Sequence, residues 1–541
     1  MSRLDQRRLF AGVAGAAVLI GVITLVARVA GFGRTFAFSQ TVGTTCLGTA
    51  YFTANGVPNI VFEIVVNGAL AGMVVPVLAA EVQRGDREHV RQTTAALLTW
   101  VALATVPLTL LVALAAGPLM SLLIGPTAGC DAEATIALAA RMLVVFAPQV
   151  LIYGFAAVLY GVLQAHRHFF APALAPLLSS LIVIGAYFAF MPLGDGYQHD
   201  VSGLPKAAEL TLSLGTTIGV FALLVTALVP SLRLGLSWRP TLRFPPGTGR
   251  RVRALALASL FPLVAQQLSL LVVIMLSNWV GGGGALPVYN IAWGLFNLPY
   301  AVLALPIATS AFPELSARAS NGEHDSFDTT LAQSVRTVVL VGAGGAAALA
   351  AAAVPLGRVF GAGEAAQAEM ARALVTFAPG LIGFGLIALV GRALYASGHG
   401  RASAVWQVAG WLTVIAADVA LVLAAPPGWT VPALGAGNTI GLTLGAVALM
   451  LVLVRARGRA AVAGLARTLV AGVLGAAAGY ASGRLVAITL DSAHEWVSAG
   501  LAVGSGLLAL VVFAAVAAAV DGRALRAALR GRRARAVQDE R

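Results

Sequence analysis

The chain has 541 residues, of which 59% are hydrophobic and only 11% are charged. An ordinary soluble domain carries about 25% charged residues, so the composition excludes a soluble enzyme, a disordered tail and a disulfide scaffold. The net charge of +13 does not indicate nucleic-acid binding, because the 34 arginines and the single lysine lie mostly in short segments between apolar runs. The sequence therefore predicts an all-α integral membrane protein.

Apolar runs separated by polar breaks predict about fourteen membrane spans, since a helix needs about 20 mainly apolar residues to cross a bilayer. In chain order they lie at 10–30, 47–80, 92–116, 134–163, 172–192, 207–231, 254–279, 286–312, 330–356, 370–397, 403–424, 431–454, 462–487 and 496–520. Most basic residues between spans fall on the side of Met1, and only Lys206, Arg358, Arg372 and Arg484 fall on the other. The positive-inside rule then places both termini in the cytoplasm.

Two pairs of motifs recur in the two halves of the chain. Phe146-Ala147-Pro148 is echoed by Phe377-Ala378-Pro379, and Val57-Pro58-Asn59 by Leu298-Pro299-Tyr300. They predict two six-helix lobes related as parallel repeats, an architecture typical of transporters; the alternative is chance similarity between apolar segments. The predicted divisions are an N-terminal lobe at 1–235, a C-terminal lobe at 236–458, two further spans within 459–522 and a basic cytoplasmic tail at 523–541.

Ionisable side chains inside spans are the best candidates for function, because each costs roughly 2.5–3.5 kcal/mol at mid-helix. Arg28 and Arg34 would stand about 120° apart on an unbroken helix. The intervening Gly31-Phe32-Gly33 offers a break that would let both side chains point into one cavity. The alternative is that both arginines snorkel to the membrane edge.

Two acidic side chains also fall inside spans. Glu63 follows the Pro58-Asn59 break, and Arg28 or Arg34 is its natural partner. Asp418 lies in the middle of the span at 403–424. Its functional interpretation is ion or proton coupling, and the alternative is a hydrogen bond to a neighbouring helix.

The sequence predicts no catalytic residue, metal site or cofactor. The seven histidines show no ligand spacing, and Lys206 follows a proline, so no Walker A motif exists to support ATP hydrolysis. Cys46 and Cys130 form no C-x-x-C pair. Both fall on the predicted outer side, where they could form a disulfide if that compartment is oxidising.

The segment at 25–34, Leu-Val-Ala-Arg-Val-Ala-Gly-Phe-Gly-Arg, resembles the first-span signature of the MurJ/MviN lipid II flippases. This family belongs to the superfamily of multidrug, oligosaccharidyl-lipid and polysaccharide exporters. The resemblance continues through Leu47–Tyr51, Ala54-Asn55, Val57-Pro58-Asn59, Asn67–Leu70, Val75–Leu78, Leu295–Pro299 and Pro313–Ser316. The pattern resembles that of a divergent, actinobacterial-type member of the family.

The resemblance implies that undecaprenyl-diphosphate-linked peptidoglycan precursor moves across the bacterial inner membrane by alternating access. Membrane potential or an ion gradient would drive the cycle, and no cofactor is expected. Two substrate-contacting arginines of the family fall on Arg28 and Arg34, and the same motifs place Asn55, Asn59 and Glu63 beside the substrate path. Expected partners are lipid II, the bilayer and other cell-wall synthesis proteins.

The chain also departs from the family pattern. Thr49 replaces a common acid, Phe62-Glu63 replaces an arginine pair, and Gly294 stands at an arginine position. A sodium-type site would have only Asp418, with Thr439 or Thr443 as distant candidates. A polysaccharide or multidrug exporter of the same superfamily, and a non-transporting scaffold for cell-wall assembly, therefore stay open as alternatives.

Overall fold

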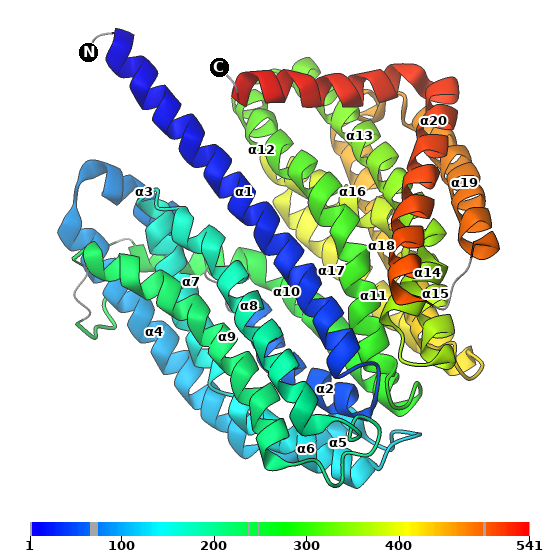
Figure 1. Ribbon diagram of the computed structural model, residues 1–541. Helices are drawn as coiled ribbons and strands as arrows, with labels where there is room; N and C mark the ends of the chain where they lie inside the picture. Colours follow the sequence, from blue (N-terminus) through cyan, green and yellow to red (C-terminus); the bar gives the residue numbers. More distant parts are fainter. Residues whose placement is uncertain (1–2, 65–73, 236–238, 247, 491–493, 540–541) are drawn as a thin grey trace. The chain divides into compact units, whose positions relative to one another are not determined.

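The computed structural model describes residues 3–64, 74–235, 239–246, 248–490 and 494–539, which contain helices and connecting turns but no strand. The chain divides into two compact units, Met1–Leu270 and Leu271–Arg541. The division falls inside a helix, well after the lobe boundary expected near residue 235, and the predicted lobe limits stay predictions. Figure 1 follows the chain from the blue N-terminal helix to the red C-terminal one.

The first unit combines long helices with shorter helices that follow one another after a short break. They are α1 (Arg3–Thr41), α2 (Cys46–Phe62), α3 (Val74–Arg84), α4 (Arg87–Leu114), α5 (Ala116–Ile124), α6 (Ala132–Phe146), α7 (Gln149–Ala165), α8 (Phe170–Gly194), α9 (Lys206–Arg233) and α10 (Thr248–Trp279), the last of which continues into the second unit.

The second unit repeats this combination and adds two helices at its end. Its elements are α11 (Ala285–Pro299), a π-helical turn (Tyr300–Ala304), α12 (Leu305–Ser320), α13 (His324–Ala351), α14 (Ala353–Phe360), α15 (Glu364–Phe377), α16 (Gly380–Ala396), α17 (Gly400–Ala424), α18 (Thr430–Arg457), a 3₁₀ turn (Arg459–Val462), α19 (Leu465–Thr489) and α20 (Glu495–Asp539).

Twelve helical segments of the described chain are long and apolar enough to cross a membrane, and the bent pair of α15 and α16 makes a thirteenth. Each corresponds to one predicted span. The remaining predicted span, 47–80, contains α2 and α3 at its ends, while residues 65–73 lie outside the described residues. The all-helical, multi-pass membrane fold is therefore confirmed, and the count of fourteen stays a prediction.

The described part of the first span continues past its predicted end. The sequence predicts a span at 10–30, and the described apolar segment of α1, Leu19–Thr41, overlaps it and extends beyond residue 30. Helical hydrogen bonding continues through the predicted break, and α1 is one uninterrupted helix (Figure 1). Glycine is compatible with helical geometry inside a membrane span, and here α1 packs along α8, with buried Ala37 and Phe38 following the glycines. Both candidate arginines consequently lie in the interior of the span.

The motif repeat is visible in the local structure. α6 ends at Phe146 and α7 begins at Gln149, just as α15 ends at Phe377 and α16 begins at Gly380. Proline lacks the N–H that would continue the hydrogen-bond ladder, so each pair of helices bends at the same point; the bend between α15 and α16 is 44°. The second motif pair differs locally: Pro58 lies inside α2, whereas Pro299 ends α11 and a π-helical turn follows it directly.

Small residues allow two helices of the second unit to approach closely. Gly437, Gly441 and Gly445 of α18 recur every four residues, so they share one face. They contact Asp418, Val414 and Gly410 of α17 in that order. Contacts between small residues at this spacing are a common way to associate helices in a membrane, where lipid competes for apolar surfaces.

We expect Gly441→Ala to destabilise the protein. A Cβ atom at Gly441 would lie 2.6 Å from the Val414 backbone nitrogen, and backbone cannot move aside as a side-chain tip can. Overpacking of this kind typically costs about 1–3 kcal/mol. The measurement is the melting temperature in detergent, with Gly500→Ala as the control, because a Cβ atom there meets nothing within 4 Å. Equal melting temperatures for the two variants would contradict the close packing.

The two C-terminal helices are tied to α13 by a buried polar group. Arg336 of α13 donates to both Asp521 carboxylate oxygens, at 3.1 and 3.0 Å, and to the Thr468 hydroxyl of α19 at 2.9 Å. Asp521 marks a kink in α20, which turns sharply at its C-terminal part (Figure 1). These bonds explain why α19 and α20 belong to the second unit.

Candidate functional site

Arg28 and Arg34 project from different faces of α1. Because the helix is continuous, the predicted break at Gly31–Gly33 is wrong, and six residues of α-helix separate the two side chains by about 120°. Arg34 falls seven residues after buried Ala27 and four before buried Phe38, so it shares the packed side of the helix. Both arginine side chains are exposed, and neither makes a hydrogen bond or ion pair within the part of the chain that the structure describes.

Tyr153 of α7 brings the residues of the second span toward Arg34. Its hydroxyl donates to Asn59 Oδ1 at 3.3 Å, and its ring lies 4.3 Å from that of Phe62. The charges of both Arg34 and Glu63 act on its phenol group. Tyr153 therefore contacts Asn59 directly and lies within electrostatic range of Arg34 and Glu63, whereas Arg28 is not among the charges that act on it.

A second group of hydroxyls lies beside the first. Tyr51 of α2 is hydrogen-bonded to the Tyr187 hydroxyl of α8 at 2.9 Å and to the Thr216 hydroxyl of α9 at 2.7 Å. The Arg34 charge acts on both phenols, and Phe38 packs against both rings. We call Arg34, Tyr51, Tyr153 and Tyr187 the arginine–tyrosine cluster.

Sequence reasoning missed the three tyrosines of this cluster. In the sequence Tyr51 stands out only as part of the motif Leu47–Tyr51, and no motif includes Tyr153 or Tyr187. A usable signal was present: a tyrosine hydroxyl buried in a span needs a polar partner, so tyrosines in apolar runs point to polar interiors.

Asn55 stands one helical turn before Asn59 on α2, so the two amides share a face. The Asn55 Oδ1 atom is buried and has no hydrogen-bond partner among the described residues. Asn55 thus offers an unused acceptor on the face that carries Asn59.

Asp418 of α17 is the buried acid of the second unit. Its side chain has 0% exposure, and among the described residues neither carboxylate oxygen has a hydrogen-bond partner. It contacts Gly437 of α18, and its charge acts on Tyr289, which interacts with Asn438. The missing bond to a neighbouring helix leaves ion or proton binding as the interpretation that the geometry favours.

The other two candidates for an ion site do not join Asp418. Thr439 donates its hydroxyl hydrogen to the Thr376 carbonyl oxygen at 2.7 Å. Thr443 is exposed. Asp418 therefore has Tyr289 and Asn438, rather than the two threonines, as its polar neighbours.

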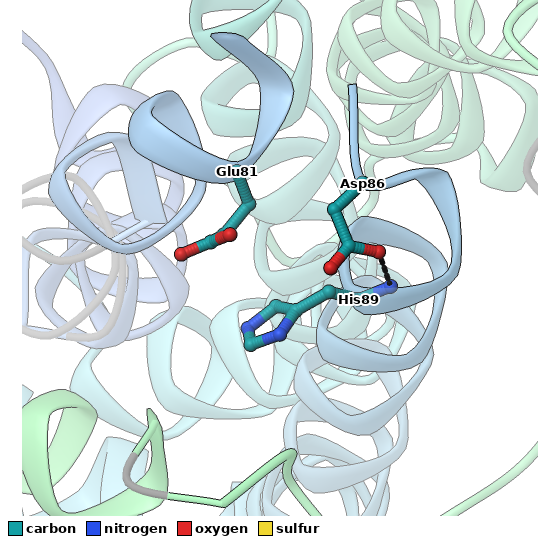
Figure 2. A group of neighbouring side chains, drawn as sticks. All are labelled: Glu81, Asp86 and His89. Carbon is teal, nitrogen blue, oxygen red and sulfur yellow. Dashed lines mark hydrogen bonds between the residues drawn. The ribbon is translucent and has the colours of Figure 1, made fainter. Parts of the chain in front are cut away.

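Glu81, Asp86 and His89 form the one group in the described chain with metal-ligand proximity, as Figure 2 shows. Each already has a local partner. Asp86 accepts the His89 N–H at the start of α4, Glu81 pairs with Arg84 at 2.9 Å, and His89 Nε2 lies 3.2 Å from the Thr248 hydroxyl. These contacts explain the grouping as a capped turn between α3 and α4.

Residues 38–505 match the family model described as lipid II flippase MurJ. The chain belongs to this family. The lipid II flippase MurJ of Burkholderia cenocepacia is 26% identical over 385 residues, which cover 70% of this chain and 73% of that protein. The family that the sequence resembles is thereby confirmed.

Solved structures show the same fold. A lipid II flippase MurJ in an inward closed conformation superposes with a TM-score of 0.68 at 17% identity, covering 93% of this chain and 99% of that one. An inward-facing multidrug resistance MATE family transporter of the MOP superfamily gives a TM-score of 0.63 at 16% identity, covering 82% and 98%. The chain therefore shares its fold with both of these transporters.

The positions that depart from the MurJ family pattern have identifiable roles here. Thr49 is buried and donates its hydroxyl hydrogen to the Thr45 carbonyl oxygen at 3.1 Å. Phe62 packs its ring on that of Tyr153. Gly294 has open space around its Cβ direction. Asn67–Leu70, a further part of the resemblance, lies outside the described residues.

The two cysteines form a disulfide in the structure, with their Cα atoms 5.8 Å apart. It joins the first residue of α2 to the turn just before α6. The bond joins residues with a sequence separation of 84 within the first unit. In a chain-entropy model, the lower entropy of the cross-linked unfolded chain raises the free energy of unfolding by about 4–5 kcal/mol.

Proposed function

We propose that this protein is a lipid II flippase, which moves the undecaprenyl-diphosphate-linked precursor from the inner to the outer leaflet by alternating access. The membership of residues 38–505 in the MurJ family carries this proposal. The protein performs no covalent chemistry on its substrate. It resides in the bacterial inner membrane with both termini in the cytoplasm, as the basic residues between spans favour.

The diphosphate is the part of the lipid that is hardest to move through hydrocarbon, and Arg34 is its proposed anchor. A guanidinium group offers paired N–H donors that match phosphate oxygens. Arg28 lies about 9 Å nearer the N-terminus along α1. With that end in the cytoplasm, the headgroup meets Arg28 first and Arg34 deeper in the membrane.

Asn55, Asn59 and Glu63 complete the proposed substrate path. Asn55 contributes its unused amide oxygen, and Asn59 its amide beside Tyr153. Glu63 shares Tyr153 with Arg34, so it can balance the arginine charge when the path is empty. Arrival of the diphosphate then replaces Glu63 as the counter-charge of Arg34.

Asp418 is the proposed coupling site. A buried carboxylate without hydrogen bonds is unfavourable as a bare anion, so it must take up a proton or a cation. Uptake and release at Asp418 would link an ion gradient or the membrane potential to the conformational cycle. ATP is not required, and other cell-wall synthesis proteins are proposed partners.

Replacing Arg34 by Ala should lower lipid II translocation by about tenfold or more, the range expected for losing a charge-assisted hydrogen bond worth 1.5–3 kcal/mol. Arg28→Ala should have a smaller effect, because Arg28 lies outside the arginine–tyrosine cluster. The measurement is leaflet accessibility of labelled lipid II in cells that depend on this protein. Exposed Arg401 provides the control, as Arg401→Ala. Wild-type translocation by Arg34→Ala would refute the anchor, and failure of the unmodified protein to complement a flippase-deficient cell would indicate a scaffold.

Glu63→Gln keeps the size of the side chain and removes its charge. If Glu63 competes with the diphosphate for Arg34, the variant should bind lipid II several-fold more tightly and release it more slowly. Equilibrium binding and turnover of the purified protein measure both quantities. Unchanged affinity together with unchanged turnover would exclude the role of Glu63 in balancing Arg34.

Asp418→Asn should abolish the dependence of transport on the ion gradient, because an amide can take up neither a proton nor a charge-compensating cation. Binding of lipid II should persist, since Arg34 lies in the other unit. The measurement compares transport into vesicles with and without imposed proton and sodium gradients. Asn438→Asp is the matched variant, which restores a carboxylate one helix away. Full gradient dependence in Asp418→Asn would refute the coupling site.

A further inference from the structure

The second unit contains a cavity of about 590 Å³ among α14, α15, the start of α18 and the end of α19. Three arginines from three helices line it: Arg358 of α14, Arg372 of α15 and Arg484 of α19. Trp429 and Tyr480 supply aromatic walls. The cavity lies where these helices end, away from Asp418 in the middle of its span.

This gathering of charge is unusual for the protein. The arginine distribution assigns only four basic residues to the outer side of the membrane, and three of them line this one cavity. Like charges held together in a partly buried space repel each other unless an anion balances them. The lining contains a single carboxylate, Glu364, on the exposed start of α15.

A second carboxylate lies nearby. Glu369 accepts the backbone N–H of Val431 at 3.1 Å at the start of α18, and its charge also interacts with that of Arg372. The three arginines of the cavity still outnumber these two carboxylates.

The aromatic rings hold the guanidinium groups while leaving N–H donors unused. The Arg372 guanidinium lies 5.0 Å from the centre of the Trp429 ring and donates to the Gly428 carbonyl oxygen at 2.7 Å. Its buried Nε has no hydrogen-bond partner in the described chain. The Arg484 guanidinium lies 5.8 Å from the centre of the Tyr480 ring. Within the described residues Arg484 makes no hydrogen bond or ion pair.

We propose that this cavity binds a phosphate group, either on the headgroup of an anionic lipid or free in solution. Fixed guanidinium edges from several helices suit the oxygens of a phosphate, which accept several N–H donors at once. The position favours a lipid, because basic pockets between membrane helices bind such headgroups. Trp429, which is 43% exposed just before α18, is an aromatic residue of the kind that lies at the membrane interface. The proposal does not depend on lipid II transport.

The full-length protein, purified in detergent, can test this site with two probes. Native mass spectrometry measures retention of phosphatidylglycerol against phosphatidylcholine, and thermal shift measures stabilisation by inorganic phosphate in lipid-free detergent. Arg484→Gln is the main variant, because Arg372 also supports Gly428. Arg401→Gln is the control, since Arg401 is exposed at the start of α17. A melting temperature without ligand close to that of wild type shows that Arg484→Gln is folded.

We expect the wild type and Arg401→Gln to retain phosphatidylglycerol at least fivefold better than Arg484→Gln does, with little retention of phosphatidylcholine. This result would identify a lipid headgroup as the phosphate source. Stabilisation by inorganic phosphate that is lost in Arg484→Gln, without selective lipid retention, would identify free phosphate. If neither probe separates Arg484→Gln from the wild type, the proposal is overturned.

Discussion

A guanidinium group in the middle of an apolar helix is the constraint on which the first unit depends. Arg34 sits inside the span Leu19–Thr41, where a charge costs roughly 2.5–3.5 kcal/mol. Tyrosine hydroxyls from α2, α7 and α8 lie within electrostatic range of the Arg34 charge, and polar groups near a charge reduce its cost in an apolar environment. α1 must remain continuous for Phe38 to pack against Tyr51 and Tyr187 and so keep Arg34 in this position.

The two repeated halves share a helix arrangement but surround an equivalent arginine with different charges. Arg141 and Arg372 each lie seven residues before the repeated proline. Arg141 pairs with buried Glu209 at 2.9 Å, whereas Arg372 donates to a carbonyl oxygen, lies over an aromatic ring and interacts with Glu369 only at longer range. Within the described residues, the arginine of the second unit thus lacks the direct ion pair that its counterpart in the first unit makes. The two units can differ in charge because the proline break and the helix contacts, rather than the charges, determine the helix arrangement that they share.

The spans and the repeat could be predicted because they depend on local patterns: apolar length for the spans, and proline for the bends at Ala147 and Ala378. The path of α1 could not, since its continuity through Gly31 depends on packing against α8. Tyr153 and Tyr187 were missed for a related reason: they approach Arg34 from α7 and α8, and no sequence spacing encodes that meeting. The lack of hydrogen bonds to Asp418 likewise appears only when its neighbours, Gly437 and Tyr289, are placed.

The disulfide between Cys46 and Cys130 cross-links the first residue of α2 to the turn before α6, and no disulfide joins the other end of α2. From Cys46 to Phe62 the helix is about 25 Å long. A tilt of about 10° around the cross-linked end would displace the opposite end by roughly 4 Å, more than the length of a hydrogen bond. A small tilt of α2 would therefore make or break the contacts of Asn59 and Glu63, while the residues beside Cys46 would move very little.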